Sequence, residues 1–184
     1  MILTQEQMKI HLISRYVDVR LHRPIITEQT ATFLLYNYNE QLVGWQRYAP
    51  NNKHLSNNSF SGKYYTYRSN SQIAVFGLES VNIDSRVIFI TEGIFDAVRL
   101  TSHEIPAIAL LTNAPNSSML NFLVCLGRKL VGVCDNDDGG RFLKNRLSKI
   151  TNTFYTPSAK DLGECSELEV KNLINKFYGR KLHD

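Results

Sequence analysis

The chain has 184 residues, of which 43% are hydrophobic, 10% aromatic and 21% charged. A chain of this size and composition can bury a substantial core without disulfide or metal staples, which argues against disorder. The 21 Lys and Arg residues exceed the 17 Asp and Glu residues by only four charges, too few to identify a partner. The excess nevertheless has a location. Residues 41–78 contain no Asp or Glu, whereas residues 81–184 hold 13 basic and 12 acidic side chains.

The three cysteines, Cys125, Cys134 and Cys165, are widely spaced and form no C-x-x-C pair. This pattern argues against a disulfide framework and against a zinc finger, so we interpret them as reduced thiols that serve in packing. The first residues lack the basic and apolar regions of a leader sequence, and no apolar run approaches the ~18 residues of a membrane span. We therefore expect a cytoplasmic protein with no membrane partner.

The chain begins with a helix signal. Thr4 and Gln7 have the spacing of a capping box, and apolar residues at helical spacing follow as far as Val17. These features predict a first helix that starts after Thr4. A shorter second helix is expected to start at Thr27.

Strand signals follow this helix. Residues 33–38 and 42–48 are rich in aromatic and β-branched side chains and flank the turn signal at 39–41, which predicts a hairpin. Residues 49–72 are polar and rich in Asn and Ser, so we expect a long loop that a short strand at 63–67 interrupts. The front of the chain, residues 1–82, is thus predicted to be a small basic α+β subdomain.

The character of the sequence changes after about residue 84. Short apolar runs alternate with amphipathic stretches of about ten residues, which predicts βαβ units and a parallel sheet flanked by helices. The expected strands are 87–91, 107–112, 130–135 and 153–156, and the expected helices are 94–103, 116–126, 139–150 and 165–177. Residues 83–184 are therefore predicted to form an α/β domain of the Rossmann-like kind.

Carboxylates follow two of the predicted strands. Glu92, Gly93 and Asp96 come after the strand at 87–91, and Asp135 and Asp137 come after the strand at 130–135. The carboxyl ends of parallel strands are where ligands bind in such sheets. Grouped carboxylates repel one another unless a cation neutralises them, and a set of oxygen ligands without His or Cys suits Mg²⁺ or Mn²⁺. This edge is therefore predicted to hold a divalent metal site for phosphoryl or nucleotidyl transfer.

Each motif also has a simpler interpretation. An E-G-x-x-D sequence alone is usually the start of a helix with an acid at the favourable end of the dipole. A D-x-D-x-G sequence alone is often a solvated turn. Because both occur here after apolar strands of one α/β unit, 43 residues apart, the pair favours a catalytic site.

These two motifs, Glu92-Gly93-x-x-Asp96 and Asp135-x-Asp137-x-Gly139, resemble those of the TOPRIM domain. TOPRIM domains occur in primases of the bacterial and phage type, in topoisomerases and in some nucleases. The loop at 111–114 resembles the one between these motifs in primases. The segment at 160–165 resembles the K-D-x-N-E stretch of phage primase-helicases, with Gly163 in place of the usual Asn.

The front half of the chain distinguishes primases from the other proteins that contain a TOPRIM domain. Residues 42–47, 62–65 and 75–79 resemble the small basic subdomain that precedes TOPRIM in primase cores. The resemblance implies a primase-type nucleotidyltransferase that makes short RNA primers on single-stranded DNA from NTPs with Mg²⁺ or Mn²⁺. It further implies a phage or mobile-element replication system, a location in the host cytoplasm, and a separate replicative helicase as partner.

The resemblance also implies roles for particular residues. Glu92, Asp135 and Asp137 would bind the metal ions and carry catalysis, with Glu92 assisting deprotonation of the attacking 3′-hydroxyl. Asp96 would support this metal site, unless it is a simple acid on a helix surface.

Contacts to nucleic acid and nucleotide are expected from a further set of residues. The candidates are Arg47, Lys63, Arg68, Arg141, Lys160 and Asp161. Arg141 could instead face solvent. Trp45, Tyr64, Tyr65 and Tyr67 could stack on bases, although alternate aromatic residues of a strand usually fill the core, and for Trp45 we favour the core.

Two other functions use the same residues. A TOPRIM nuclease would cleave DNA or RNA with the same carboxylates and water as the nucleophile. A non-catalytic accessory protein or primase inhibitor would bind nucleic acid alone. The intact acids Glu92, Asp135 and Asp137 speak against the second, because a pure binder gains nothing from clustered negative charge beside DNA.

Overall fold

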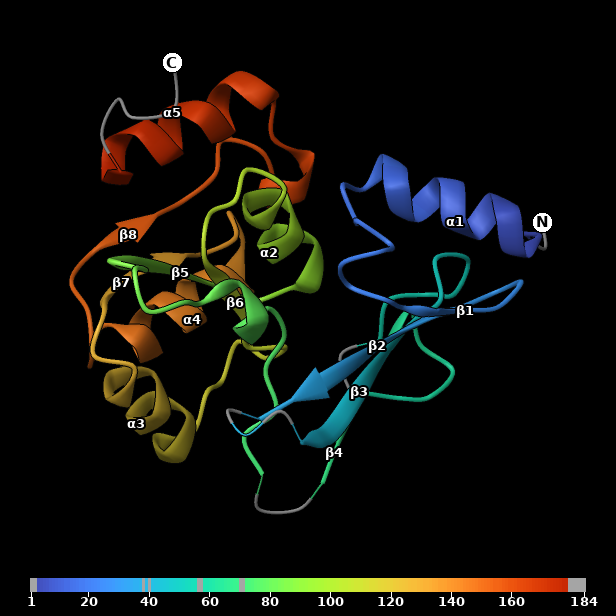
Figure 1. Ribbon diagram of the computed structural model, residues 1–184, viewed down its shortest axis with the longest axis horizontal. Coiled ribbons are helices and arrows are strands. Elements are labelled where there is room, and N and C mark those ends of the chain that lie inside the picture. Colours follow the sequence, from blue (N-terminus) through green and yellow to red (C-terminus); the bar gives the residue numbers. More distant parts are fainter. Residues whose placement is uncertain (1–2, 38, 40, 56–57, 70–71, 179–184) are drawn as a thin grey trace. The chain divides into compact units, whose positions relative to one another are not determined.

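The computed structural model describes residues 3–37, 39, 41–55, 58–69 and 72–178. The chain forms two compact units, Met1–Phe76 and Gly77–Asp184. The first contains a four-stranded antiparallel sheet and the second a four-stranded parallel sheet with helices (Figure 1). The predicted α/β class, with an α+β unit in front, is confirmed. No helix in the described ranges combines the length and apolar character needed to cross a membrane.

The first unit begins with α1 (Gln5–Ser14), where the sequence predicts it. The Thr4 hydroxyl accepts a hydrogen bond from the Gln7 amide at 3.2 Å, and the Thr4 amide donates to Gln7 Oε1 at 2.8 Å. This capping box satisfies two amides that the first turn would otherwise leave without partners. Met8 and Leu12, one turn apart, are both buried, so one side of α1 packs into the core of the unit.

The antiparallel sheet follows in chain order. Its strands are β1 (Ile25–Ile26), β2 (Ala31–Tyr36), β3 (Leu42–Tyr48) and β4 (Tyr64–Arg68). The β2–β3 hairpin and the short strand β4 are confirmed, while Tyr38 and Glu40 of the expected hairpin lie outside the described residues. The helix expected at Thr27 is wrong. The Thr27 hydroxyl instead accepts a hydrogen bond from the Thr30 amide at 3.1 Å and closes the turn between β1 and β2.

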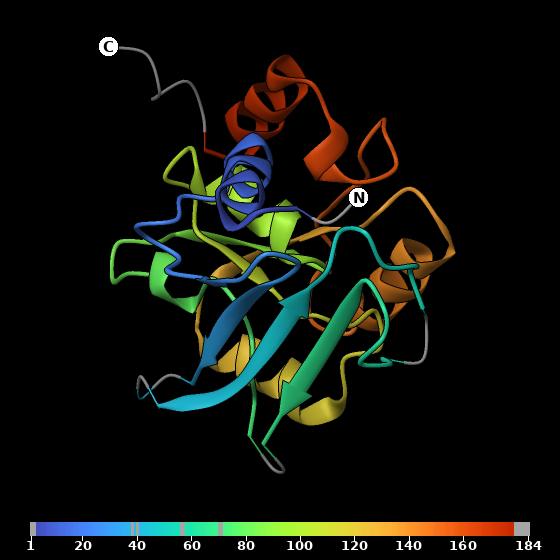
Figure 2. The same ribbon diagram turned by 90° about the vertical axis from the view of Figure 1, so that its right-hand side faces the viewer.

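Alternation along the strands gives this sheet two different faces (Figure 2). The inner face carries buried Phe33 and Tyr48, and the Tyr48 hydroxyl lies 2.8 Å from His11 Nε2 of α1. The outer face carries Trp45, which is only half-buried. The expectation that Trp45 fills the core is therefore wrong, because Trp45 lies three positions before Tyr48 on the same strand and so points to the opposite face.

The second unit contains a sheet in which all neighbours are parallel, in the order β6-β5-β7-β8. Its strands are β5 (Val87–Thr91), β6 (Ala107–Ala109), β7 (Lys129–Val133) and β8 (Phe154–Tyr155), and its helices are α2 (Ile94–Thr101), α3 (Ser117–Cys125), α4 (Asp138–Leu147) and α5 (Glu167–Tyr178). Figure 1 shows α2 and α5 on one side of this sheet and α3 and α4 on the other. The predicted order of elements is confirmed, although β6 ends three residues earlier than expected.

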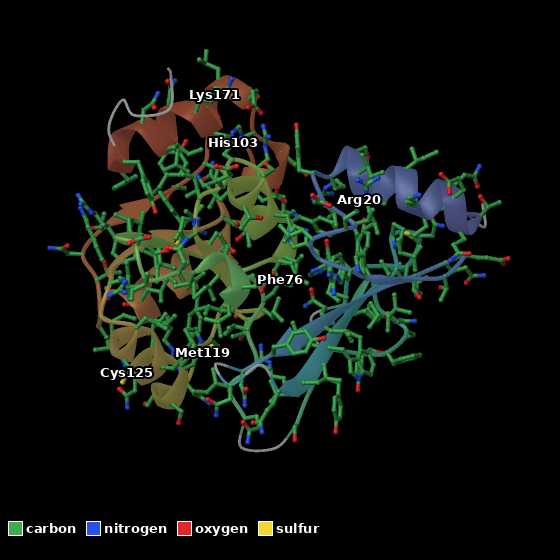
Figure 3. The ribbon with its side chains drawn as sticks, in the orientation of Figure 1. Arg20, Phe76, His103, Met119, Cys125 and Lys171 are labelled. Atoms are coloured by element: carbon green, nitrogen blue, oxygen red, sulfur yellow. The ribbon has the colours of Figure 1, made fainter. Side chains whose placement is uncertain are left out.

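A buried charge joins two helices of this unit. Arg99 of α2 is 1% exposed, and its Nη2 lies 2.8 Å from Glu167 Oε2 at the start of α5. His103 and Lys171 also approach the Glu167 carboxylate, at 3.1 Å and 3.9 Å (Figure 3). Although burial acts in the opposite direction, the hydrogen bond and charge of Arg99 lower the pKa of Glu167. These contacts hold α5 against α2 on one side of the parallel sheet.

Candidate active site at the carboxyl edge of the parallel sheet

Two neighbouring strands bring the predicted motifs to one edge. β5 and β7 are parallel partners, with Ile90 opposite Gly132. Glu92 follows the last residue of β5, and Asp135 follows β7 by two residues. Because parallel strands end at the same edge, the two acids emerge side by side, as the sequence predicts.

The acids at this edge lie close enough together to affect the pKa of Asp135. Burial raises the pKa of Asp135 to about 8, together with the negative charges of four neighbours. We call these five residues the carboxylate cluster: Asp135, Asp96, Glu92, Asp161 and Asp137. Burial and the charge of Asp137 likewise raise the pKa of Glu92. The fold therefore holds several carboxylates close together, where their charges oppose the ionisation of Asp135 and Glu92.

Asp96 lies inside the unit. Its side chain is 5% exposed, so the interpretation as a helix-surface acid is wrong. Asp96 Oδ1 accepts a hydrogen bond from the Gly163 amide at 3.1 Å. This contact ties α2 to the short 3₁₀ turn at Leu162–Glu164, so Asp96 connects the first motif to the 160–165 segment.

Two members of the cluster also cap helices. Asp137 Oδ1 accepts a hydrogen bond from the Gly140 amide at 2.9 Å and caps α4. Asp161 Oδ1 accepts from the Glu164 amide at 3.0 Å and caps the 3₁₀ turn. The turn interpretation of the second motif is thus part of the structure. Each cap uses Oδ1 alone, so capping and ligand binding are compatible.

Gly139 lies close to polar side chains of three loops. A methyl group on its Cα would lie 3.2 Å from Asn113 Nδ2, 3.2 Å from Asp137 Oδ1 and 3.5 Å from Glu92 Oε2. Three polar side chains from three loops therefore converge over a residue that has no side chain. Asn113 is not among the sequence-predicted site residues. The sequence nevertheless contains a signal that could have identified Asn113, because this residue lies in the loop after β6, the third strand that ends at this edge.

The donor set fits a hard divalent cation. The cluster contains only oxygen ligands, its carboxylates repel one another, and the space over Gly139 lies between two of them. A Mg²⁺ or Mn²⁺ ion would relieve this repulsion. Among the described residues, no three His, Cys, Asp or Glu side chains form a finished metal site. Carboxylate oxygens at one edge of a sheet are nevertheless the kind of ligand that such an ion prefers.

The basic candidates of the second unit lie around this edge. Arg141 is exposed on α4 and pairs with Asp138, one turn earlier. Lys160 is also exposed, and its carbonyl accepts a hydrogen bond from the Asn136 amide at 2.8 Å. That bond fixes the Lys160-Asp161 segment next to the second motif.

The basic candidates of the first unit are divided between regions of its sheet. Arg47 lies on the outer face and donates to the carbonyls of Phe60 and Gly62. The Lys63 ammonium lies 5.9 Å from the Tyr48 ring and 5.7 Å from the Tyr64 ring, toward the inner face. Arg68, at the end of β4, is partly buried, and burial lowers its pKa. Arg47 and Lys63 thus do not share a surface.

No protein-family model and no curated protein matches the chain. Solved structures do match. The primase fragment of the bacteriophage T7 primase-helicase protein aligns with 79% of this chain and 62% of its own, at TM-score 0.60 and 15% identity. The E. coli primase catalytic core aligns with 80% of this chain and 52% of its own, at TM-score 0.59 and 17% identity. The chain has the fold of a primase catalytic core.

A third structure extends this match. The RNA polymerase domain of Mycobacterium tuberculosis primase DnaG, in complex with double-stranded DNA, aligns with 91% of this chain at TM-score 0.59 and 15% identity. The chain spans between 52% and 63% of the length of these three structures. In this primase fold, the carboxylate cluster belongs to the TOPRIM unit, and the antiparallel sheet belongs to the unit in front of it.

Proposed function

We propose that the chain is a primase-type nucleotidyltransferase that joins ribonucleotides into short RNA primers on single-stranded DNA. The observation that carries this proposal is the carboxylate cluster at the edge where β5 and β7 end. It combines the oxygen ligands that nucleotidyl transfer requires with a fold that known primases use. The single-stranded DNA template and the replicative helicase are partners that we propose for this chain.

The metal would be held by Glu92, Asp135 and Asp137. When bound, Mg²⁺ supplies charge that neutralises phosphate oxygens and the leaving pyrophosphate. Glu92 would accept the proton of the attacking 3′-hydroxyl, because Glu92 Oε2 lies beside Gly139 together with Asp137 and Asn113. Asp96 would hold the 160–165 segment in place through the Gly163 amide.

Other residues would position the substrates. Asn113 Nδ2 also lies beside Gly139 and can donate a hydrogen bond to a phosphate oxygen there. Arg141 and Lys160 would provide charge for the triphosphate. Contacts with the template are assigned to residues 1–82, through Arg47, Lys63 and Arg68, and catalysis to residues 83–184. A replicative helicase, supplied separately, would deliver the template in a phage replication system.

A primer-synthesis assay tests the proposal. The protein is incubated with single-stranded DNA, labelled NTPs and Mg²⁺ or Mn²⁺, and the expected products are short RNAs. Asp135→Asn preserves the shape of the side chain but removes its charge, so we expect about a 100-fold loss or more. Asp84→Asn is the matched control, because Asp84 is exposed and lies outside the cluster. Its synthesis should stay within about twofold of the unchanged protein.

The same mixture separates the other functions. Shortened DNA without NTP incorporation would replace the proposal by a TOPRIM nuclease. Binding of DNA without synthesis or cleavage would replace it by an accessory protein or an inhibitor. Equal synthesis by Asp135→Asn and by the unchanged protein would remove the carboxylate cluster from the chemistry.

A further inference from the structure

The outer face of the antiparallel sheet carries aromatic rings that belong to no core. Trp45 of β3 stacks against Tyr67 of β4, with ring centroids 5.8 Å apart and an interplanar angle of 24°. Tyr65 lies 5.3 Å from Trp45 on its other side, and Phe60 lies 5.2 Å from Tyr65. We call Trp45, Phe60, Tyr65 and Tyr67 the aromatic face. Their positions follow from register, because Trp45 is the cross-strand partner of Tyr67.

These rings stay accessible to solvent. Tyr67 is 48% exposed and Phe60 is 58% exposed, while Trp45 and Tyr65 are half-buried. Exposed aromatic rings that lie side by side form an apolar patch, which is unfavourable in water unless a ligand covers it. The rings also stack on one another at distances typical of aromatic pairs. The surface they form is therefore suited to receive further flat rings.

The charge of residues 41–78 favours an anionic ligand. Residues 41–78 contain no Asp or Glu, so no carboxylate of this segment opposes an anion. The Arg47 guanidinium lies 4.1 Å from the Phe60 ring centroid, at the rim of the aromatic face. Flat rings joined by negative charges are the features that such a surface complements.

Hydrogen bonds hold the aromatic face in place. Asn58 Nδ2 donates to the Thr66 carbonyl at 2.9 Å, and the Thr66 amide donates to Asn58 Oδ1 at 2.7 Å. Asn58 lies two residues before Phe60, so this pair fastens the loop of Phe60 to β4. Arg47 donates to the Phe60 carbonyl from β3. A surface ordered in advance loses less conformational freedom when a ligand binds.

We propose that the aromatic face binds the bases of single-stranded nucleic acid by stacking, with Arg47 contacting the backbone. This inference rests on the proposed function, since it supplies a hold for the template strand outside the carboxylate cluster. Stacking on rings tolerates any base, so the binding would have little sequence preference. Each base that stacks on such a ring contributes substantially to affinity, which makes single substitutions informative.

The chain contains one tryptophan, Trp45, which makes the test direct. Oligo(dT) is titrated without metal or nucleotide, and Trp45 fluorescence should be quenched as bases stack on it. Anisotropy of a labelled oligo(dT) gives the affinity independently. Tyr67→Leu retains apolar area but loses the ring, so we expect about tenfold weaker binding, whereas Tyr67→Phe should bind like the unchanged protein. Phe142→Ala removes an aromatic side chain of similar exposure, 47%, from α4 and should leave the affinity unchanged.

Several outcomes would overturn this inference. Equal affinity of Tyr67→Leu and Tyr67→Phe would show that the ring is not stacked on a base. Unquenched Trp45 with saturated oligo(dT) would place the strand elsewhere. A dimer in light scattering that dissociates in Tyr67→Leu would show that a second copy of the chain covers the face. Because the titration needs no synthesis, the proposed function can fail while base stacking stands, and the reverse also holds.

Discussion

The carboxylate cluster and the aromatic face differ in how the chain supports them. The cluster is built from strand ends, helix caps and a buried Asp96, and three of its five acids, Asp96, Asp137 and Asp161, also hold the backbone in place. The aromatic face is built from side chains of adjacent strands that contact mainly one another. Loss of Asp96, Asp137 or Asp161 should therefore disturb the fold and function together, while changes on the aromatic face should alter binding alone.

The difference also shows what each region needs from a ligand. Repulsion in the cluster is a cost of the folded state that a cation removes. The exposed rings cost much less, because they already cover part of each other's surface. We expect cation binding to stabilise the fold strongly and nucleic acid binding to stabilise it weakly.

Two adjacent glycines give the largest expected effect. A Cβ on Gly140 would lie 1.9 Å from the Asp135 carbonyl oxygen, which is backbone and cannot move aside, so Gly140→Ala should cost about 3 kcal/mol or more. A Cβ on Gly139 meets only side-chain atoms, at 3.2 Å or more. Gly139→Ala should stay within about 1 kcal/mol of the unchanged stability and yet lose primer synthesis. Urea unfolding together with the synthesis assay measures both, and equal stability of the two variants would contradict this account.

A smaller effect of opposite sign is expected at Asp135. Asp135→Asn removes a carboxyl group whose ionisation is opposed by burial and by four neighbouring acids, so at pH 7 without divalent metal it should raise the free energy of unfolding by about 2 kcal/mol. Saturating Mg²⁺ should then stabilise the unchanged protein more than the variant. Thermal unfolding in EDTA and in Mg²⁺ checks both statements. A lower melting temperature of Asp135→Asn in EDTA would mean that the carboxylates do not repel one another as described.

The smallest effect concerns Lys63. Its ammonium lies near the Tyr48 and Tyr64 rings, so Lys63→Ala should weaken oligo(dT) binding only about threefold and should reduce the slope of log affinity against log salt by roughly 0.7. Lys9→Ala, an exposed lysine of α1, is the control of equal charge. An unchanged slope in Lys63→Ala would remove Lys63 from the phosphate contacts and leave Arg47 as the cation of that sheet.

Much of the second unit can be predicted from the sequence. VIFIT and LVGVC are apolar throughout because both faces of a parallel sheet are covered, and the acids that follow them must then share an edge. Glu92 and Asp135 follow from that rule alone. Asp96 is harder to place, because its burial depends on the Gly163 amide, 67 residues later.

The first unit is less predictable for physical reasons. Its strands have similar aromatic content on both faces, so composition does not show which ring enters the core, and Trp45 was expected inside. The turn at Thr27 contains side-chain hydrogen bonds that a helix start would use equally well. Asn113 lies in the loop at 111–114 that resembles a primase loop, but its place beside Glu92 and Asp137 depends on contacts between three loops that are distant in the sequence.

The early end of β6 has a consequence for motion. Leu111 adopts a φ of 58°, which turns the chain out of the sheet, and such a conformation is costly for a branched side chain. The Leu111 amide nevertheless donates to the Glu92 carbonyl at 2.8 Å, and the Leu110 amide donates to the Thr91 carbonyl at 3.0 Å. The loop that carries Asn113 is thereby fastened to the backbone of Glu92. The loop of Asn113 therefore cannot move away from this edge without breaking hydrogen bonds to the residues that end β5 and begin the first motif.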